Sequence, residues 1–338
     1  MNSRRSAIVI VAAVLVAIIG LSSFLYLNNL QNSGGKLESM DVAYSPFEST
    51  VLFLIAQEKG FLSQNALNVT IHRYDTGSAA LAGVINEEAD LVIGTTEFPL
   101  VTQVLNQESI QTIGSISKSN FIYIVGREDR GIHEVSDLKD KTIGTTYGTI
   151  AHYYLVRFLT LNGLNTQDVV LVDLKKPAEW VDAVVNGSVD AVATAQPSVN
   201  LAMEGLGDNA VVWSIQNNQP LYAQAIATKS WITEHPEICS RFLNAMYQAE
   251  IFLIDNPNEA KNIMKQQMNF SDAYIETVWQ QNHFSLSLDQ SLILAMESEG
   301  RWLIDNNLTS QTQIPDFINY IHAESLDSIK PGAVSIIR

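Results

Sequence analysis

The sequence of 338 residues contains a single cysteine, Cys239. One cysteine excludes an intrachain disulfide framework and a zinc site built from cysteine thiolates. Basic residues are also few, because 20 Lys and Arg stand against 36 Asp and Glu, for a formal net charge of −16. Binding to nucleic acid or to an anionic lipid surface needs clustered Lys and Arg. The charge balance therefore argues against both partners.

The sequence also lacks the short motifs of common catalytic sites. It has no GxxxxGK[ST] phosphate loop, no GxSxG nucleophile elbow and no HExxH zinc motif. The six histidines show no metal-ligand spacing. His152 is interpreted as an ordinary helix residue, with a place in a pocket as the alternative. We therefore predict no catalytic residues, no cofactor and no metal.

One long stretch without charge lies near the N-terminus, from Ser6 to Leu27. It is long enough to span a bilayer as a helix, which takes about 20 apolar residues. Arg4 and Arg5 precede it, so the following chain is expected on the extracytoplasmic side. No Ala-x-Ala cleavage site follows. Residues 1–36 are predicted to be a signal anchor with a polar tether, and a cleaved signal peptide is the alternative.

From residue 37, short apolar runs alternate with amphipathic stretches, which is typical of an α/β protein with mainly parallel sheets. Strands are predicted at residues 38–44, 68–74, 91–93, 110–115, 121–125, 142–144, 169–172, 191–193, 210–213 and 221–228. Helices are predicted at residues 50–58, 78–86, 100–106, 150–162, 178–186 and 198–205. After about Pro236 only helices are predicted, at residues 236–254, 257–268, 272–281 and 290–306.

Two segments repeat one pattern. Residues 86–95 (NEEADLVIGT) resemble residues 186–195 (NGSVDAVATA). In both, a helix ends at Asn, a turn carries Asp, and a short buried strand leads into a polar loop with proline. Two lobes of the same plan would present these loops at the carboxyl ends of their strands, where open α/β sheets bind ligands. Chance similarity between two ordinary turns is the alternative.

Four polar loops follow predicted strands, and three of them precede helices rich in apolar residues. Helix N-termini leave N–H groups free and carry partial positive charge, so several of them at one cleft can bind a small oxyanion without Lys or Arg. Ordinary helix capping is the alternative for each loop alone. The predicted ligand-binding residues are Tyr44, Ser45, Phe47, Glu48, Thr76, Gly77, Thr95, Thr96, Glu97, Thr146, Tyr147, Gly148, Thr149, Gln196 and Tyr222.

Within this set, Thr96, Thr149 and the backbone N–H groups of residues 148–149 are expected to donate to the oxyanion. A carboxylate at Glu97 would repel an anion. Glu97 is therefore predicted to face an ammonium group of a zwitterion such as an aminosulfonate, with a solvent-facing position as the alternative.

Several segments, in order, resemble a known family. They are residues 55–61 (IAQEKGF), 67–71 (LNVTI), 137–144 (DLKDKTIG), 161–164 (LNGL), 168–172 (DVVLV) and 186–191 (NGSVDA). Together they are similar to the solute-binding proteins of ABC importers for taurine, aliphatic sulfonates and nitrate, which also include binders of thiamine precursors. At one position of the family pattern Asp140 replaces the usual glycine.

The resemblance implies the two-lobed type II periplasmic-binding-protein fold, with a helical C-terminal part. Lobe 1 would hold residues 37–118 and 229–338, and lobe 2 residues 119–228. The ligand, a small oxyanion or zwitterion, would bind between the lobes, and the closed form would dock on a membrane permease powered by an ATPase. An enzyme of the thiamine-pyrimidine type, whose cysteine-rich motif is missing here, and a membrane-tethered ligand sensor are the alternatives.

Overall fold

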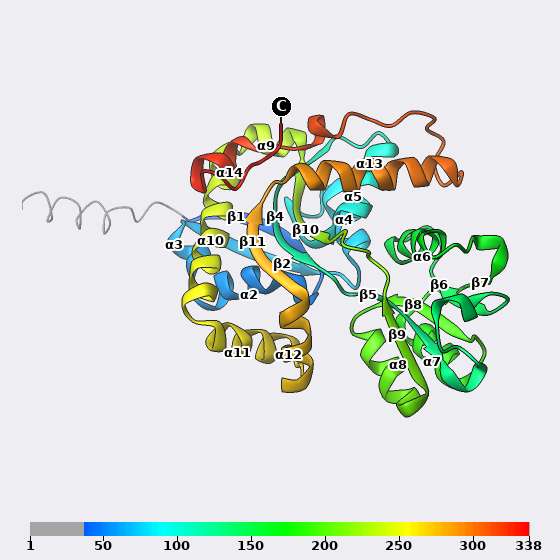
Figure 1. Ribbon diagram of the computed structural model, residues 1–338. Coiled ribbons are helices and arrows are strands. Elements are labelled where there is room, and N and C mark those ends of the chain that lie inside the picture. The colour runs from blue at the N-terminus through cyan, green and yellow to red at the C-terminus, as the bar shows by residue number, and fades with distance from the viewer. Residues whose placement is uncertain (1–36, 338) are drawn as a thin grey trace, which may run out of the picture.

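The computed structural model describes residues 37–337, which form two lobes, each around its own β-sheet (Figure 1). This confirms the predicted α/β architecture of two lobes. The predicted anchor, residues 1–36, lies outside the described residues. Within residues 37–337, no helix has both the length and the apolar character needed to cross a bilayer.

Lobe 1 contains a six-stranded sheet in the order β11-β4-β10-β3-β1-β2. Its strands are β1 (Glu38–Tyr44), β2 (Leu67–Arg73), β3 (Leu91–Thr96), β4 (Ile110–Ser119), β10 (Leu221–Thr228) and β11 (Asn282–Ser287). Its helices are η1 (Glu48–Thr50), α2 (Val51–Glu58), α3 (Phe61–Gln64), α4 (Gly77–Ile85), α5 (Glu97–Leu105), α9 (Lys229–Glu234), α10 (Pro236–Asp255), α11 (Pro257–Met268), α12 (Asp272–Gln281), α13 (Gln290–Asp305), η6 (Phe317–Tyr320) and α14 (Glu324–Ile329).

Lobe 2 contains a five-stranded sheet in the order β7-β6-β8-β5-β9. Its strands are β5 (Ile122–Arg127), β6 (Thr142–Thr145), β7 (Val170–Asp173), β8 (Ala191–Ala195) and β9 (Ala210–Ser214). Its α-helices are α6 (Ile150–Leu161), α7 (Pro177–Asn186) and α8 (Ser198–Leu206).

The two sheets share one plan. The order β2-β1-β3-β10-β4 in lobe 1 corresponds to β7-β6-β8-β5-β9 in lobe 2. In each sheet three strands are parallel, and the next strand, β10 or β5, is antiparallel to both of its neighbours. These antiparallel strands each follow a crossing of the chain between lobes. The expectation of mainly parallel sheets therefore holds only for three strands of each sheet.

The repeated segments of the sequence occupy equivalent places and make equivalent hydrogen bonds. The Asp90 carboxylate accepts from the N–H of Asp41 at 2.8 Å, and the Asp90 N–H donates to the Asp41 carbonyl at 2.8 Å. In lobe 2 the Asp190 carboxylate accepts from the N–H of Thr142 at 2.9 Å, and its own N–H donates back at 2.9 Å. In both lobes the aspartate thus ties the turn before one strand, β3 or β8, to the neighbouring parallel strand, β1 or β6.

The C-terminal part is helical except for one strand that the sequence pattern did not predict. β11 pairs antiparallel with β4, for example Phe284 opposite Ser117. Pro236 and Pro257 stand in the first turns of α10 and α11, as expected. The expectation of helices alone after Pro236 is therefore wrong for residues 282–287.

Candidate functional site

A cavity of about 770 Å³ lies between the two lobes. Its lobe 1 wall comes from the loop before η1, the N-terminus of α4, the end of β3 and the first turns of α5. Its lobe 2 wall comes from the N-termini of α6, α7 and α8. Residues of the crossing segments, Phe121, Ile122 and Leu221, complete the lining.

Helix N-termini converge on this cavity from both lobes. The residues at the starts of α4, α6 and α8 all line it. Eight of the predicted ligand-binding residues are brought together there, namely Phe47, Thr76, Gly77, Thr95, Thr96, Gly148, Thr149 and Gln196. The first turn of a helix has N–H groups without helical partners, which are the kind of donors that bind anions.

The lobe 1 wall depends on a close approach of α4 to the end of β3. A Cβ at Gly77 would lie 2.8 Å from the Gly94 carbonyl oxygen, and one at Gly94, whose φ is +87°, would lie 2.1 Å from the Ser45 carbonyl oxygen. Glycine at these two positions lets the backbones pack. The packing places Thr95 against the cavity with 2% of its surface exposed, and its Oγ1 has no hydrogen-bond partner among the described residues.

The lobe 2 wall is arranged by hydrogen bonds at the start of α6. Thr149 Oγ1 donates to the Thr146 carbonyl at 2.7 Å, and the Gly148 N–H donates to His152 Nδ1 at 3.3 Å. The Thr149 hydroxyl proton and the Gly148 N–H are thus already used within the protein. His152 stacks on Tyr147, with ring centroids 4.9 Å apart, and burial lowers its pKa. This geometry agrees with the prediction that His152 is an ordinary helix residue.

Seven predicted residues do not line the cavity, and most of them have internal partners. Tyr44 and Ser45 are buried in lobe 1, where the Tyr44 hydroxyl is 3.2 Å from Thr50 Oγ1. Buried Glu48 accepts from the Tyr274 hydroxyl at 3.0 Å, and burial raises the pKa of Glu48.

Of the other residues that do not line the cavity, Thr146 and Tyr147 lie in lobe 2 and Tyr222 lies in lobe 1. Thr146 Oγ1 accepts from Trp180 Nε1 at 3.0 Å, and the Tyr147 hydroxyl donates to the Leu171 carbonyl at 3.0 Å. The Tyr222 hydroxyl donates to Ser291 Oγ at 2.8 Å.

Glu97 lies inside lobe 1 rather than on the cavity wall. Its side chain is fully buried, and its Oε2 accepts from the Tyr222 N–H at 2.8 Å. Burial raises the pKa of Glu97 to about 8. Glu299 of α13 is fully buried beside it, and burial together with the Glu97 charge raises the pKa of Glu299 well above its usual range. The expectation that Glu97 faces a ligand ammonium group therefore does not match its position.

The charged side chains that do line the cavity are Asp75 and Asp182, both exposed. Among the described residues, 37–337, no Lys, Arg or His lines this cavity. An anion would therefore be held by neutral donors. A positive group of a ligand would meet Asp75 or Asp182 instead of Glu97.

Apart from Phe47, the apolar part of the lining was not predicted from the sequence, because the prediction considered only the polar loops. Trp180, Val181 and Leu201 contribute apolar side chains from lobe 2, Phe98 contributes one from α5 of lobe 1, and Leu221 one from a crossing segment. Trp180 could have been found, since it lies in the first turn of a predicted helix at the same sheet edge as the other loops. Its indole N–H donates to the Leu174 carbonyl at 3.0 Å, which fixes the ring at the cavity. No cluster of three or more metal-ligating side chains occurs in the part of the chain that the structure describes.

Comparison of the sequence and the fold with known proteins shows to which family the chain belongs. A segment of 211 residues, 61% of this chain, is 27% identical to a protein of Haemophilus influenzae named for thiamine biosynthesis and spans 66% of it. An aliphatic sulfonates-binding protein of Bacillus subtilis is 24% identical over 78% of this chain and 80% of its own length. The fold matches the crystal structure of the periplasmic aliphatic sulphonate binding protein SsuA from Escherichia coli with a TM-score of 0.72 at 17% identity, covering 84% of this chain and 97% of that one. The family described as NMT1/THI5 like matches residues 48–260, most of the chain, so the resemblance seen in the sequence is confirmed and the chain belongs to the NMT1/THI5-like family.

Proposed function

We propose that the chain is the solute-binding component of an ABC importer, which captures a small oxyanion between its lobes on the extracytoplasmic side of the membrane. The observation that carries the proposal is the interlobe cavity of about 770 Å³ at which the N-termini of α4, α6 and α8 meet. Residues 1–36 would anchor the chain in the membrane, and a permease with its ATPase would receive the solute.

The cavity chemistry supports an organic oxyanion more than a simple inorganic one. Hydroxyl groups and helix-start N–H groups would hold the oxygens, with Thr95 Oγ1 and the N–H groups in the first turn of α6 as the proposed donors. The walls are otherwise mostly apolar, with Trp180, Phe98 and Leu201 among them. Nitrate would leave these walls uncovered, whereas an alkyl group would cover them and gain hydrophobic free energy. An alkanesulfonate therefore fits better than nitrate, and the ammonium group of taurine would meet Asp75 or Asp182.

A binding role also accounts for the cavity better than catalysis does. The hydroxyl groups of Ser49, Ser78 and Ser198 line it without a histidine or lysine beside them as a base. The one cysteine, Cys239, is buried in α10, and burial raises the pKa of its thiol to about 12. A thiol with so high a pKa is a poor nucleophile at neutral pH.

Calorimetric titration of the purified full-length chain with hexane-1-sulfonate, taurine and nitrate tests the proposal. We expect 1:1 binding with a dissociation constant in the micromolar range or below for at least one sulfonate, and the weakest binding for nitrate. Small-angle scattering should show a more compact particle with the bound solute. Absence of binding by all three at millimolar concentration would overturn the proposal.

A further inference from the structure

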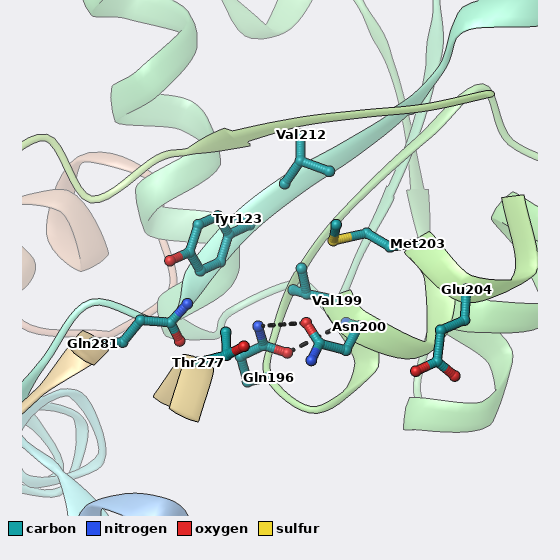
Figure 2. A pocket seen from close by; sticks show the side chains of 9 residues that line it. All are labelled: Tyr123, Gln196, Val199, Asn200, Met203, Glu204, Val212, Thr277 and Gln281. Carbon is teal, nitrogen blue, oxygen red and sulfur yellow. Dashed lines mark hydrogen bonds between the residues drawn. The ribbon is translucent and has the colours of Figure 1, made fainter. Parts of the chain in front are cut away.

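A second, smaller cavity of about 410 Å³ also lies between the lobes (Figure 2). Its lobe 2 side is formed by β5, β9 and α8, and its lobe 1 side by the C-terminal end of α12. The lining residues are Tyr123, Gln196, Val199, Asn200, Met203, Glu204, Val212, Thr277 and Gln281. Gln196 lines both this cavity and the larger one.

On the lobe 2 side, two carboxamides hold each other. Gln196 Nε2 donates to Asn200 Oδ1 at 3.0 Å, and the Asn200 N–H donates to Gln196 Oε1 at 3.2 Å. Gln196 is 4% exposed, so this pair is fixed at the end of β8. Neither bond uses the Nδ2 group of Asn200. The Asn200 Nδ2 group is therefore still available as a donor at the cavity.

On the lobe 1 side, Thr277 and Gln281 lie one turn apart on α12 and face the Gln196–Asn200 pair across the cavity (Figure 2). Gln281 Oε1 is shielded from solvent and has no hydrogen-bond partner among the described residues. The Thr277 hydroxyl donates to the Ala273 carbonyl at 3.1 Å, so its oxygen remains an acceptor. An unpartnered acceptor and an available donor thus lie on opposite sides of one cavity between the lobes.

We propose that these four residues form an interlobe latch, in which Asn200 Nδ2 donates to Gln281 Oε1 when the lobes close around a solute. A shielded acceptor without a partner is costly, and closure removes that cost. The latch rests on the proposed function, because the solute supplies the reason to close. It makes Asn200 and Gln281 determinants of affinity although neither lines the solute cavity. Gln196, which lines both cavities, connects the latch to the solute.

The first test is a double-mutant cycle with hexane-1-sulfonate as the solute and the full-length chain. We expect Asn200→Ala and Gln281→Ala each to raise the dissociation constant about three- to tenfold, and the double variant to raise it no further than either one. Gln281→Glu retains an acceptor oxygen and should bind more tightly than Gln281→Ala. The matched control is Gln280→Ala, the exposed neighbour on the same helix, which should change the constant less than twofold. Additive effects of the two variants, or none, would overturn the latch.

The second test does not depend on which solute binds. Cys239 is buried, so the pair Asn200→Cys with Gln281→Cys adds the only accessible thiols of residues 37–337. A short bifunctional thiol reagent such as a bis-maleimide should link them, because the closed latch holds the side chains of positions 200 and 281 at hydrogen-bond distance from each other. The pair Asn200→Cys with Gln280→Cys should link at least tenfold more slowly. If neither pair links, the latch is wrong even if sulfonates bind, whereas linking without sulfonate binding would retain the latch and reject the proposed solute class.

Discussion

The two lobes meet at two edges that differ in chemistry. At the packed edge, Tyr153 of α6 contacts lobe 1, with its ring centroid 6.3 Å from that of Phe98 and 5.7 Å from that of Trp302. Its hydroxyl is 2.8 Å from Ser298 Oγ. At the latch edge, α8 faces α12 across a cavity of about 410 Å³ whose lining includes the carboxamides of Gln196, Asn200 and Gln281. Aromatic rings are already in contact at the first edge, whereas polar groups are still apart at the second, so we expect the lobes to move mainly at the latch edge.

The largest effect is expected from removing the ring at the packed edge. Tyr153 is 2% exposed, so Tyr153→Ala would leave a cavity between α5, α6 and α13. We expect the free energy of unfolding to fall by about 3 kcal/mol or more, as for other buried aromatic residues. Urea denaturation measures it. Gln281→Ala at the latch edge should leave the same quantity unchanged or slightly raise it, because it removes a shielded acceptor without a partner, and equal losses for the two variants would contradict the difference between the edges.

The buried carboxyl pair next to the packed edge should make stability depend on pH. The pKa of Glu97 is about 8 in the folded chain against an ordinary value of 4.5, so the folded state holds more protons between these values. The stabilisation is therefore complete below about pH 4.5 and is lost as the pH rises through about 8. The expected slope is about 1.4 kcal/mol per pH unit for each proton.

Unfolding free energies measured in urea between pH 5 and pH 9 test this dependence. Glu97→Gln should flatten the curve, because a neutral amide can still accept from the Tyr222 N–H. The control is Glu87→Gln, which changes an exposed acid of the same lobe. A wild-type curve that rises with pH would show that the pair is ionised in the folded chain, and an equal slope in Glu97→Gln would show that another group carries the dependence.

The fold was largely readable from the sequence because its local signals agree with its long-range pairing. Asp90 and Asp190 are an example, since the repeated turn in the sequence makes the same two hydrogen bonds in each lobe. β11 is the opposite case. Its residues 282–287 form a strand because β4, more than 160 residues earlier in the chain, offers them an edge, and no local pattern contains that information.

The candidate site was predictable in its polar loops and not in its side-chain directions. Thr96 and Phe98 line the cavity while Glu97 between them does not. Its direction is set by the Tyr222 N–H and by the neighbouring Glu299, which are far away in the sequence. Hydroxyl-rich helix starts are visible in a sequence, whereas the choice between cavity and interior depends on such distant partners.

A smaller effect is expected in the larger cavity of about 770 Å³, where the solute is proposed to bind. Thr95→Val removes a buried hydroxyl without a partner, so the unliganded chain should be as stable as the wild type or slightly more so. The dissociation constant of hexane-1-sulfonate should rise about tenfold if Thr95 Oγ1 binds the sulfonate, which corresponds to about 1.4 kcal/mol. Thr194→Val is the matched control, because that hydroxyl is also buried without a partner but does not line the cavity. Equal affinity in the two variants would remove Thr95 from the site.

The smallest effect is expected from Ser298→Ala, which removes one hydrogen bond from the packed edge and leaves its rings in place. The loss should be about 1 kcal/mol or less, since the Tyr153 hydroxyl can still donate to Gln219 Oε1, 3.4 Å away. The affinity for hexane-1-sulfonate distinguishes the edges more sharply than this loss does. If the packed edge is the same before and after closure, a bond there stabilises both states equally and cannot shift the equilibrium between them. Titration of Ser298→Ala should therefore give a dissociation constant within twofold of the wild type, whereas Gln281→Ala should not. A change in affinity as large as that of Gln281→Ala would mean that the packed edge also rearranges on closure.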